Sequence, residues 1–301
     1  MGTTYKVKYV AETDAYSQTI HDDIKSALEL ISDQMSTHRP KSEISRFNKL
    51  KKGQKLKVSK DFITVIKFAK FLQKETDGAL DVSAGPLVNV WGFGPQSRYN
   101  RPPKQSVIDA AKAKVNLNAV MIKGRYLQKA TNDVYIDLSP IARGFGVDKM
   151  ASVLSHYGIN NYQIEIDGEF RVKGTQANGE QWHIALKYPN KRIKYLDPRD
   201  MAVATSSEQR HFFEKNGKRY SHIIDPVSGY PIQHNLVSVT VMSKNTMMAD
   251  GYATAMMVMG KEKAMQFAMK HKLAVMMVEK GKTGYKVTFS DAFKPYLKSV
   301  R

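Results

Sequence analysis

The chain has 301 residues, 42% of them hydrophobic and 10% aromatic, which excludes a disordered protein, and no apolar run approaches the roughly 18 residues of a membrane-spanning helix. It contains no cysteine, which excludes thiol nucleophiles, disulfides and zinc sites built on cysteine. Its formal net charge of +19 comes from lysines dispersed over most segments without a nucleic-acid-binding motif, so we attribute the charge to solubility or to an anionic substrate or surface and expect no nucleic-acid partner.

The N-terminal third is predicted to contain one strand and two long helices. Residues alternate over Tyr5–Val10, which indicates a strand rather than a signal peptide, although a chain cut after an export signal or lipid anchor would begin in the same way. Apolar residues recur at helical spacing over Ser17–Met35, and Ser59 is placed to cap a second helix over Lys60–Glu75. The glycines and prolines of Gly78–Pro95 favour irregular structure.

The remaining two thirds alternate short strands with helices. A basic loop (Gln96–Lys104) and a short helix are predicted to lead to strands near Val120 and Val134, and a helix over Ile141–Tyr157 is expected to end at Gly158. Further strands are predicted at Tyr162–Val172, Trp182–Tyr188, Met201–Thr205, Leu236–Met242, Leu273–Val278 and Tyr285–Phe289, with helices at Thr246–Met259 and Lys261–His271. The pattern indicates an α+β fold with mixed or antiparallel sheets and packed helices, as a single domain over residues 1–301 or as two interlocked lobes.

Asp250 and Thr254 form a pair with metal-binding potential. Residues four apart on a helix lie on the same face, so a carboxylate and a hydroxyl would offer two hard oxygen ligands to a cation such as Mg²⁺. An aspartate near the start of a helix and a core threonine bonded to its own helix backbone explain the same spacing. The spacing alone favours this structural explanation.

The segment Asp137–Gly144 runs from a strand end through a proline turn into a helix. It would place Arg143 and backbone N–H groups near a helix N-terminus, which is a natural anion site. An ordinary strand–turn–helix connection, with Asp137 and Ser139 as caps, explains the segment equally well.

Two further segments have both a chemical and a structural explanation. His222 lies between apolar residues, and it is suited to act as a general base, although a lone histidine on a strand is more often structural. The segment Gly85–Gly94 would bring backbone close to a flat ligand, with Trp91 or Phe93 packing on it. It does not contain the dinucleotide-binding glycine pattern, and the chain has no P-loop.

Taken together, these segments resemble the ApbE family of FAD:protein FMN transferases over nearly the whole chain. The matching blocks occur in the family's order, which makes chance similarity implausible. They are Met1–Tyr5, Met35–Asn48, Gly78–Asp81, Gly85–Gly94, Asp137–Gly144, Glu165–Glu169, Ala202–Ser206, Tyr220–Pro226 and Ala249–Thr254.

The resemblance implies a T-fold-like α+β architecture with the active site in a cleft. It also implies Mg²⁺-dependent cleavage of FAD, with release of AMP and transfer of FMN to a Thr or Ser of an acceptor flavoprotein. The implied metal ligands are Asp250, Thr254 and the backbone carbonyl of Pro140, and the implied catalytic residues are His222, as the base, and Arg143. FAD contacts are implied at Met1, His38, Ala79, Leu80, Asp81, Asp137, Arg143 and Ile224.

The sequence departs from the family pattern on the FAD side. His38 stands where a tyrosine commonly stacks on the adenine, Arg143 replaces a usual lysine, and Asp167 replaces a glycine. These changes affect the details of FAD binding and the balance between transfer and hydrolysis, whereas the implied metal ligands and His222 are retained.

Two alternatives to the transferase remain at this stage, an Mg²⁺-dependent FAD pyrophosphatase giving FMN and AMP, and a non-catalytic flavin-binding protein. Because family members are usually exported and often lipid-anchored, the resemblance further implies an extracytoplasmic location. Membrane association is expected only through an anchor outside this sequence.

Overall fold

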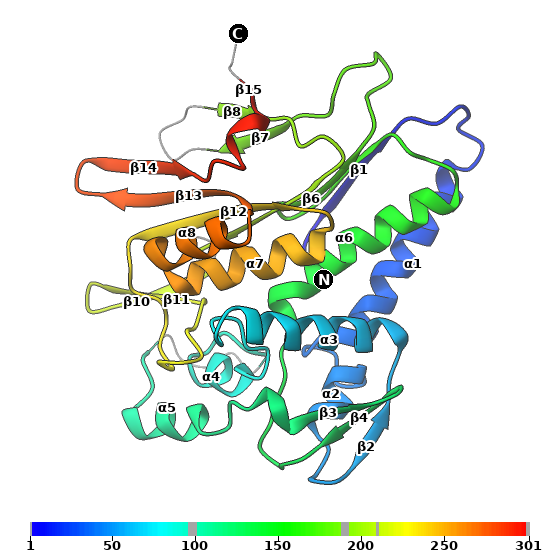
Figure 1. The fold of residues 1–301 in the computed structure, drawn as a ribbon. Coiled ribbons are helices and arrows are strands. Elements are labelled where there is room, and N and C mark those ends of the chain that lie inside the picture. The colour runs from blue at the N-terminus through cyan, green and yellow to red at the C-terminus, as the bar shows by residue number, and fades with distance from the viewer. Residues whose placement is uncertain (1, 96–100, 188–192, 209–210, 299–301) are drawn as a thin grey trace. The chain divides into compact units, whose positions relative to one another are not determined.

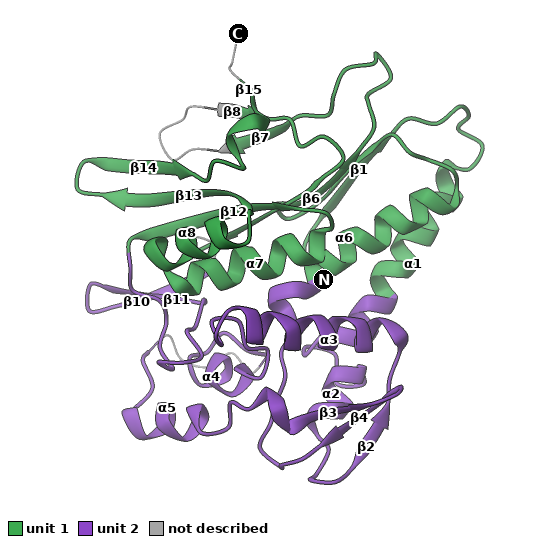
Figure 2. Cartoon of the chain, viewed as in Figure 1, with its two compact units in different colours: residues 1–29, 143–207, 235–301 green, residues 30–142, 208–234 purple. Residues whose placement is uncertain are grey.

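The computed structural model describes residues 2–95, 101–187, 193–208 and 211–298 (Figure 1). The chain forms two compact units that alternate along the sequence (Figure 2). Unit 1 comprises residues 1–29, 143–207 and 235–301, and unit 2 comprises residues 30–142 and 208–234. Two helices, α1 (Ser17–Met35) and α6 (Ser139–His156), belong to both units along the chain. Within the described ranges, no helix combines the length and apolar character that a membrane span needs.

Unit 1 is built on a seven-stranded sheet in which every neighbouring pair is antiparallel, which is one of the two alternatives, mixed or antiparallel, that the sequence left open. The first strand of the chain forms one edge of the sheet, the strand that ends at Phe289 forms the other edge, and five strands lie between them. In order across the sheet, the strands are β1 (Tyr5–Tyr9), β5 (Tyr162–Ile166), β6 (Glu169–Lys173), β9 (Ala202–Ser207), β12 (Leu236–Ser243), β13 (Ala274–Gly281) and β14 (Gly284–Phe289).

Helices cover one face of this sheet (Figure 1). Side chains from α1 and α6, among them Ile20, Ile24 and Leu154, pack on the inward-facing side chains of β5, such as Ile164. Helix α7 (Thr246–Met259) packs against β9 and β12, and α8 (Lys261–Lys270) contacts α7 and β13. Because successive side chains of a strand point to opposite faces, the other face of the sheet forms a separate core.

That second core of unit 1 lies against a small three-stranded sheet. This sheet has the order β15 (Leu297–Lys298), β8 (Ile193–Leu196), β7 (Ile184–Lys187), and a short 3₁₀ helix, η2 (Lys294–Tyr296), precedes β15. Buried Trp182 and Phe293 pack with Val172 and Val203 of the large sheet. Unit 1 is therefore layered, with helices on one face of its large sheet and a β-layer on the other.

Unit 2 combines one long helix and several short ones with two small antiparallel sheets. One sheet has the order β2-β4-β3, and the other is the hairpin β10-β11. The core around Trp91 is formed by side chains from α4, α5 and the segments around β10 and β11. The elements are α2 (Glu43–Asn48), β2 (Lys55–Lys57), α3 (Lys60–Glu75), α4 (Gly85–Val90), α5 (Gln105–Lys112), the 3₁₀ helix η1 (Leu117–Ala119), β3 (Val120–Lys123), β4 (Tyr126–Lys129), β10 (Phe212–Lys215) and β11 (Lys218–Ser221).

The long helices agree with the predictions from sequence to within a residue or two. The predicted bounds of α1, α3 and α7 are those observed, and the N–H of Phe62 donates to the Ser59 hydroxyl at 3.1 Å, so Ser59 caps α3 as expected. Gly158 has φ 72°, the left-handed conformation expected of the residue that ends α6.

Three predictions of local structure are wrong. The single strand predicted over Tyr162–Val172 is the hairpin β5-β6, because Asp167 and Gly168 form a two-residue turn. In the described chain no strand forms at Val134. Tyr135 makes only an isolated bridge to Ala84, and the nearest strand, β4, ends before Val134, at Lys129. The segment Gly78–Pro95 contains α4, since its proline lies in the first helical turn, where a missing N–H costs nothing. The predicted basic loop falls partly on 96–100, outside the described residues.

Candidate active site

In unit 1, α6 and α7 approach each other at Gly144 and Asp250. The N–H of Gly144 donates to Oδ2 of Asp250 at 2.9 Å. A Cβ atom on Gly144 would lie 2.4 Å from the carbonyl oxygen of Thr246 and 2.8 Å from the Cβ of Asp250, far inside contact distance. Glycine at 144 is therefore required for this approach, which brings the Asp250 carboxylate to the α6 backbone.

Asp148 holds the same two helices together one turn further along α6. Its carboxylate accepts hydrogen bonds from the N–H groups of Thr246 at 2.8 Å and of Met247 at 2.9 Å, in the first turn of α7. A negative charge at a helix N-terminus is favourable. Burial nevertheless raises the pKa of Asp148 above its usual value, against the effect of these hydrogen bonds. No role was predicted for Asp148 from the sequence, although Asp148 lies four residues after Gly144 and therefore on the same face of α6.

Asp250 is a buried carboxylate, 3% exposed. Burial raises its pKa to about 6, the charge of Asp148 adds to the shift, and Arg143 and the Gly144 N–H oppose it. The ionised carboxylate is thus costly in the free protein, and a cation beside it would reduce that cost. Thr254 follows Asp250 by four residues on α7, so the Thr254 hydroxyl and the Asp250 carboxylate lie on one helix face. The Thr254 side chain is partly exposed.

Arg143 connects this region to the β5-β6 hairpin. Its Nη1 lies 3.0 Å from Oδ2 of Asp167, and its Nη2 lies 3.3 Å from Oε1 of Glu169. Burial lowers the pKa of Arg143, but the carboxylates of Glu169, Asp250 and Asp167 outweigh this effect and raise that pKa above its usual value. Glu169 lies in one of the blocks that match the family, but its ion pair with Arg143 was not predicted from the sequence.

The other predicted site residues, apart from Met1, belong to unit 2. Asp137 accepts a hydrogen bond from the N–H of Ser139 at 2.9 Å. This bond satisfies a backbone donor at the start of α6, which is the capping role that the structural explanation predicted for Asp137. Its own N–H donates to the carbonyl of Val82 at 2.8 Å. The Asn48 side chain fixes the preceding residue, accepting from the N–H of Ile136 and donating to its carbonyl, both at 2.9 Å. Asp137 is therefore held rigidly at the end of an extended segment.

The block around Asp81 is organised by that carboxylate. Asp81 accepts hydrogen bonds from the N–H of Ser83 at 2.7 Å, from its hydroxyl at 2.6 Å, and from Nε2 of Gln73 at 2.5 Å. Ala79 is partly exposed, whereas Leu80 is 2% exposed and belongs to the core. Any contact of Leu80 with a ligand is thus restricted to its main chain.

His222 follows β11 and is fixed by the main chain of His211. Its Nδ1 lies 2.9 Å from the carbonyl oxygen of His211, which also accepts the N–H of His222 at 2.9 Å. A carbonyl can only accept, so Nδ1 carries the proton and Nε2 is the basic nitrogen. The ring is edge-on to those of His211 and Phe93 at centroid distances of 5.4 and 6.3 Å. Such a ring has one defined tautomer and one defined orientation, as a general base requires.

The remaining predicted site residues, three FAD contacts and the metal ligand Pro140, have different surroundings. His38 is exposed in a turn, where its N–H donates to the Ser36 hydroxyl at 3.3 Å. Ile224 is 7% exposed and lies in the core cluster around Trp91. Pro140 is partly exposed in the first turn of α6, one turn before Gly144. Met1 lies outside the described residues.

Trp91 does not provide an open platform for a flat ligand. Its indole is 2% exposed, donates from Nε1 to the carbonyl of Gly229 at 2.9 Å and stacks on Tyr220 at a centroid distance of 5.7 Å. The sequence predicted that Trp91 or Phe93 packs on a flat ligand; burial contradicts this for Trp91, whereas for the partly exposed Phe93 it stays a prediction. The role of Trp91 is to hold the Gly229 turn against α4.

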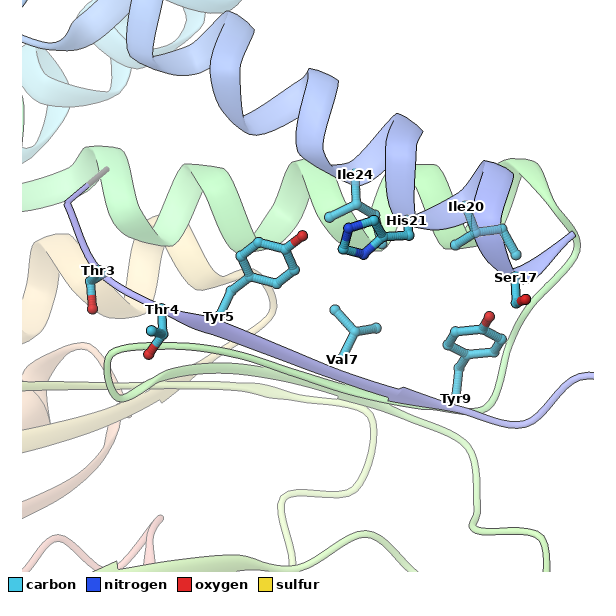
Figure 3. A pocket seen from close by; sticks show the side chains of 9 residues that line it. All are labelled: Thr3, Thr4, Tyr5, Val7, Tyr9, Ser17, Ile20, His21 and Ile24. Carbon is cyan, nitrogen blue, oxygen red and sulfur yellow. The ribbon is translucent and has the colours of Figure 1, made fainter.

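Unit 1 also contains a groove of about 690 Å³ between β1 and α1 (Figure 3). Tyr5, Val7 and Tyr9 point into it from the strand, and His21 and Ile24 face them from the helix. None of the predicted site residues lines this groove. The predicted site residues with polar side chains or carbonyls therefore fall into two groups, each described within its own unit: Arg143, Asp250 and Thr254 in unit 1, and Asp81, Asp137, Pro140 and His222 in unit 2.

Comparison with known proteins gives a consistent result. Residues 1–277 match the model of the ApbE family. The chain is 44% identical to a FAD:protein FMN transferase of Vibrio cholerae, covering 99% of this chain and 90% of that protein, and 40% identical to one of Haemophilus influenzae, covering 98% and 88%. Among solved structures, it is similar to the flavin transferase ApbE of Vibrio cholerae, with a TM-score of 0.92 and 44% identity over 98% of this chain and 96% of that one. It is also similar to the apo flavinyl transferase ApbE of Pseudomonas stutzeri, with a TM-score of 0.93 and 37% identity over 98% and 94%.

Proposed function

The chain belongs to the ApbE family, and on that premise we propose that it transfers the FMN part of FAD to a hydroxyl group of a target protein. The observation that carries the proposal is the contact between Gly144 of α6 and the buried carboxylate of Asp250 on α7, with Arg143 directly before Gly144 in the sequence. This contact brings together a carboxylate, which can bind a cation, and a guanidinium, which can bind phosphate oxygens, and phosphoryl transfer uses both kinds of positive charge.

The reaction requires few covalent steps. The acceptor hydroxyl attacks the phosphorus of the FMN half of FAD, the bond from that phosphorus to the bridging oxygen breaks, and AMP departs with the bridging oxygen. His222 takes the proton of the hydroxyl at Nε2, since Nδ1 is committed to the His211 carbonyl. Arg143 spreads the charge of the phosphate oxygens through its fork of donors. The product is a phosphoester between FMN and the side chain of a Thr or Ser in the acceptor flavoprotein.

We further propose that Mg²⁺ takes part, with Asp250, Thr254 and the Pro140 carbonyl as its protein ligands. In the described part of the chain, no three carboxylate, histidine or cysteine side chains form a metal-binding group. One carboxylate with neutral oxygens nevertheless fits Mg²⁺, which commonly takes one or two carboxylates and completes its shell with substrate phosphates and water. The raised pKa of Asp250 supports the proposal, because the buried carboxylate lacks a full counter-charge. When bound, Mg²⁺ would act as a Lewis acid on the pyrophosphate.

The test is incubation of the protein with FAD, Mg²⁺ and an acceptor flavoprotein that the Vibrio cholerae relative modifies. We expect the acceptor to gain the mass of one FMN group and AMP to be released in equal amount. Asp250→Asn, which removes the charge and keeps the shape, should abolish both products. Release of free FMN at a rate that the acceptor does not change would identify a pyrophosphatase instead. No product of either kind, with the relative active in parallel, would leave only a flavin-binding role.

We also propose an extracytoplasmic location, which rests on the family resemblance alone. The test is to fuse a reporter that is active only outside the cytoplasm to the protein as its gene encodes it. Reporter activity comparable with that of a known exported fusion supports the proposal, and an inactive reporter in a stable fusion contradicts it.

A further inference from the structure

The tip of the β5-β6 hairpin meets α6 at a charged cluster. Asp167, in the turn, and Glu169, the first residue of β6, each place a carboxylate on a different terminal nitrogen of Arg143, at 3.0 and 3.3 Å. The guanidinium is thus held from two directions by a single hairpin. Because a planar fork between two fixed acceptors has little rotational freedom, its orientation is set by the hairpin.

The turn itself does not require a carboxylate at 167. Asp167 has φ 51° and Gly168 has φ 95°, and they connect the paired residues Ile166 and Glu169. This is a two-residue turn with two left-handed residues, for which asparagine or glycine at the first position serves as well as aspartate. The negative charge of Asp167 is therefore available for a purpose other than the turn.

The Arg143–Asp167 pair is accessible, whereas Glu169 is not. The side chains of Arg143 and Asp167 are 32% and 33% exposed, and that of Glu169 is 1% exposed. Glu169 is thus the buried anchor of the guanidinium, and Asp167 is the partner that an incoming anion meets. A phosphate oxygen approaching Arg143 from solvent competes with the Asp167 carboxylate for donors and is repelled by its charge.

We infer that Asp167 is a positioning residue that acts through Arg143: it fixes the orientation of the guanidinium for the transferred phosphate and weakens the binding of FAD in the ground state. The inference rests on the proposed function, in which Arg143 contacts the FAD pyrophosphate. Its consequence is a specific trade-off. Loss of the Asp167 charge should tighten FAD binding, because one repulsive charge is removed, and should slow transfer, because Arg143 is no longer aligned.

The test is Asp167→Asn, which retains the turn and removes the charge. We expect kcat for FMN transfer to fall roughly three- to tenfold and the Kd for FAD, measured by flavin fluorescence, to fall roughly two- to threefold, as suits one partly exposed charge. Asp167→Gly should behave in the same way. General damage to the fold would raise Kd and lower kcat together. The Asp291→Asn control removes a fully exposed partner of Lys294 and should change neither quantity.

A double-mutant cycle shows whether the effect passes through Arg143. In the Arg143→Lys background the fork is absent, so Asp167→Asn should change kcat less than twofold, and the two substitutions should not be additive. An unchanged kcat in Asp167→Asn, a raised Kd, or a full effect in the Arg143→Lys background would each overturn the inference. The kcat outcomes can be interpreted only if the wild-type protein transfers FMN. If the wild type transfers none, the proposed function fails first, and the FAD affinities still test the effect on binding.

Discussion

At the scale of single residues, the chemistry depends on charges that are costly to bury. Asp250 is the clearest case, because its carboxylate is almost fully buried beside one guanidinium and one backbone N–H. The folded pKa of Asp250, about 6, exceeds the usual aspartate value of 3.8, so this carboxyl group stabilises the fold fully only below the lower value. That stability is lost as the pH rises through the folded pKa. The metal-free protein is therefore less stable at the pH values at which the Asp250 carboxylate is ionised and able to bind a cation.

This gives a pH prediction for the protein without metal. In the presence of a chelator, wild type should gain about 2 kcal/mol of unfolding free energy relative to Asp250→Asn as the pH falls from 7.5 to 4.5, since pH 4.5 lies about 1.5 units below the folded pKa and each unit corresponds to 1.36 kcal/mol. Urea unfolding of both proteins at the two pH values measures the difference. The Asn variant serves as its own control for all other titrating groups. Parallel pH profiles would show that the carboxylate is not desolvated.

His222 raises the question of whether a histidine is catalytic or only structural. The substitution His222→Asn keeps a side-chain N–H that can donate to the His211 carbonyl and removes the basic Nε2. We expect FMN transfer to fall by roughly 10²–10⁴, as for loss of a general base, while the affinity for FAD changes less than about threefold. Transfer rates and flavin binding, measured on one preparation, test this. An active Asn variant would assign His222 a structural role.

At the scale of elements, the pair α6 and α7 forms the framework of the unit 1 site. Neither helix has a pronounced apolar face, and specific polar contacts join the two helices. Asp148 binds the first turn of α7, and Gly144 provides the space for Asp250. The metal ligands proposed on α7 are therefore positioned by a neighbouring helix that contributes backbone and one capping carboxylate.

Gly144→Ala tests this arrangement. An added Cβ 2.4 Å from the Thr246 carbonyl forces the helices apart, because backbone cannot move aside as a flexible side chain can. We expect a loss of about 2–3 kcal/mol in the free energy of unfolding, together with a loss of transfer activity. Ser155→Ala, on the exposed face of the same helix, is the matched control and should stay within about 0.5 kcal/mol of wild type. Equal stability of the two variants would mean that α6 and α7 are not in contact at Gly144.

At the scale of the whole molecule, two units alternate along the chain, and each contains some of the predicted site residues. The chain's net charge of +19 is consistent with an anionic substrate such as FAD, although its lysines are too dispersed to indicate a location for binding. Ligand binding to the folded state alone raises the stability of the whole chain by mass action.

Mg²⁺ and FAD together should therefore raise the melting temperature. At ligand concentrations about 100 times Kd, the expected stabilisation is about 2.7 kcal/mol, or roughly 5 °C for a chain of this size. In Asp250→Asn the part of the shift that depends on Mg²⁺ should disappear, while a smaller shift with FAD alone remains. Differential scanning fluorimetry with Mg²⁺, FAD, both and neither separates the two. An Mg²⁺-dependent shift that survives in Asp250→Asn would place the metal elsewhere.

The sequence by itself determined the long helices, the α+β class and the order of the family's blocks. Helices α1, α3 and α7 were predictable because a periodic apolar face and a cap such as Ser59 are local signals. The hairpin at Asp167 was missed although Asp-Gly is a local turn signal, because the apolar residues on both sides of it were interpreted as one strand. The helix α4 and the burial of Trp91 were missed because they depend on partners distant in sequence, the Tyr135 backbone and the Gly229 turn.

The same distinction holds for the candidate site. Spacing alone could not separate a metal-binding Asp250 from a structural one, and it assigned nothing to Asp148 or Glu169. Only the tertiary structure brought residues 143–148, 167–169 and 246–250 together, because the contacts between them span from 24 to 106 residues of sequence. Desolvation and ion pairing act through space, so the raised pKa of Asp250 and the position of Arg143 were decided by packing rather than by any local pattern.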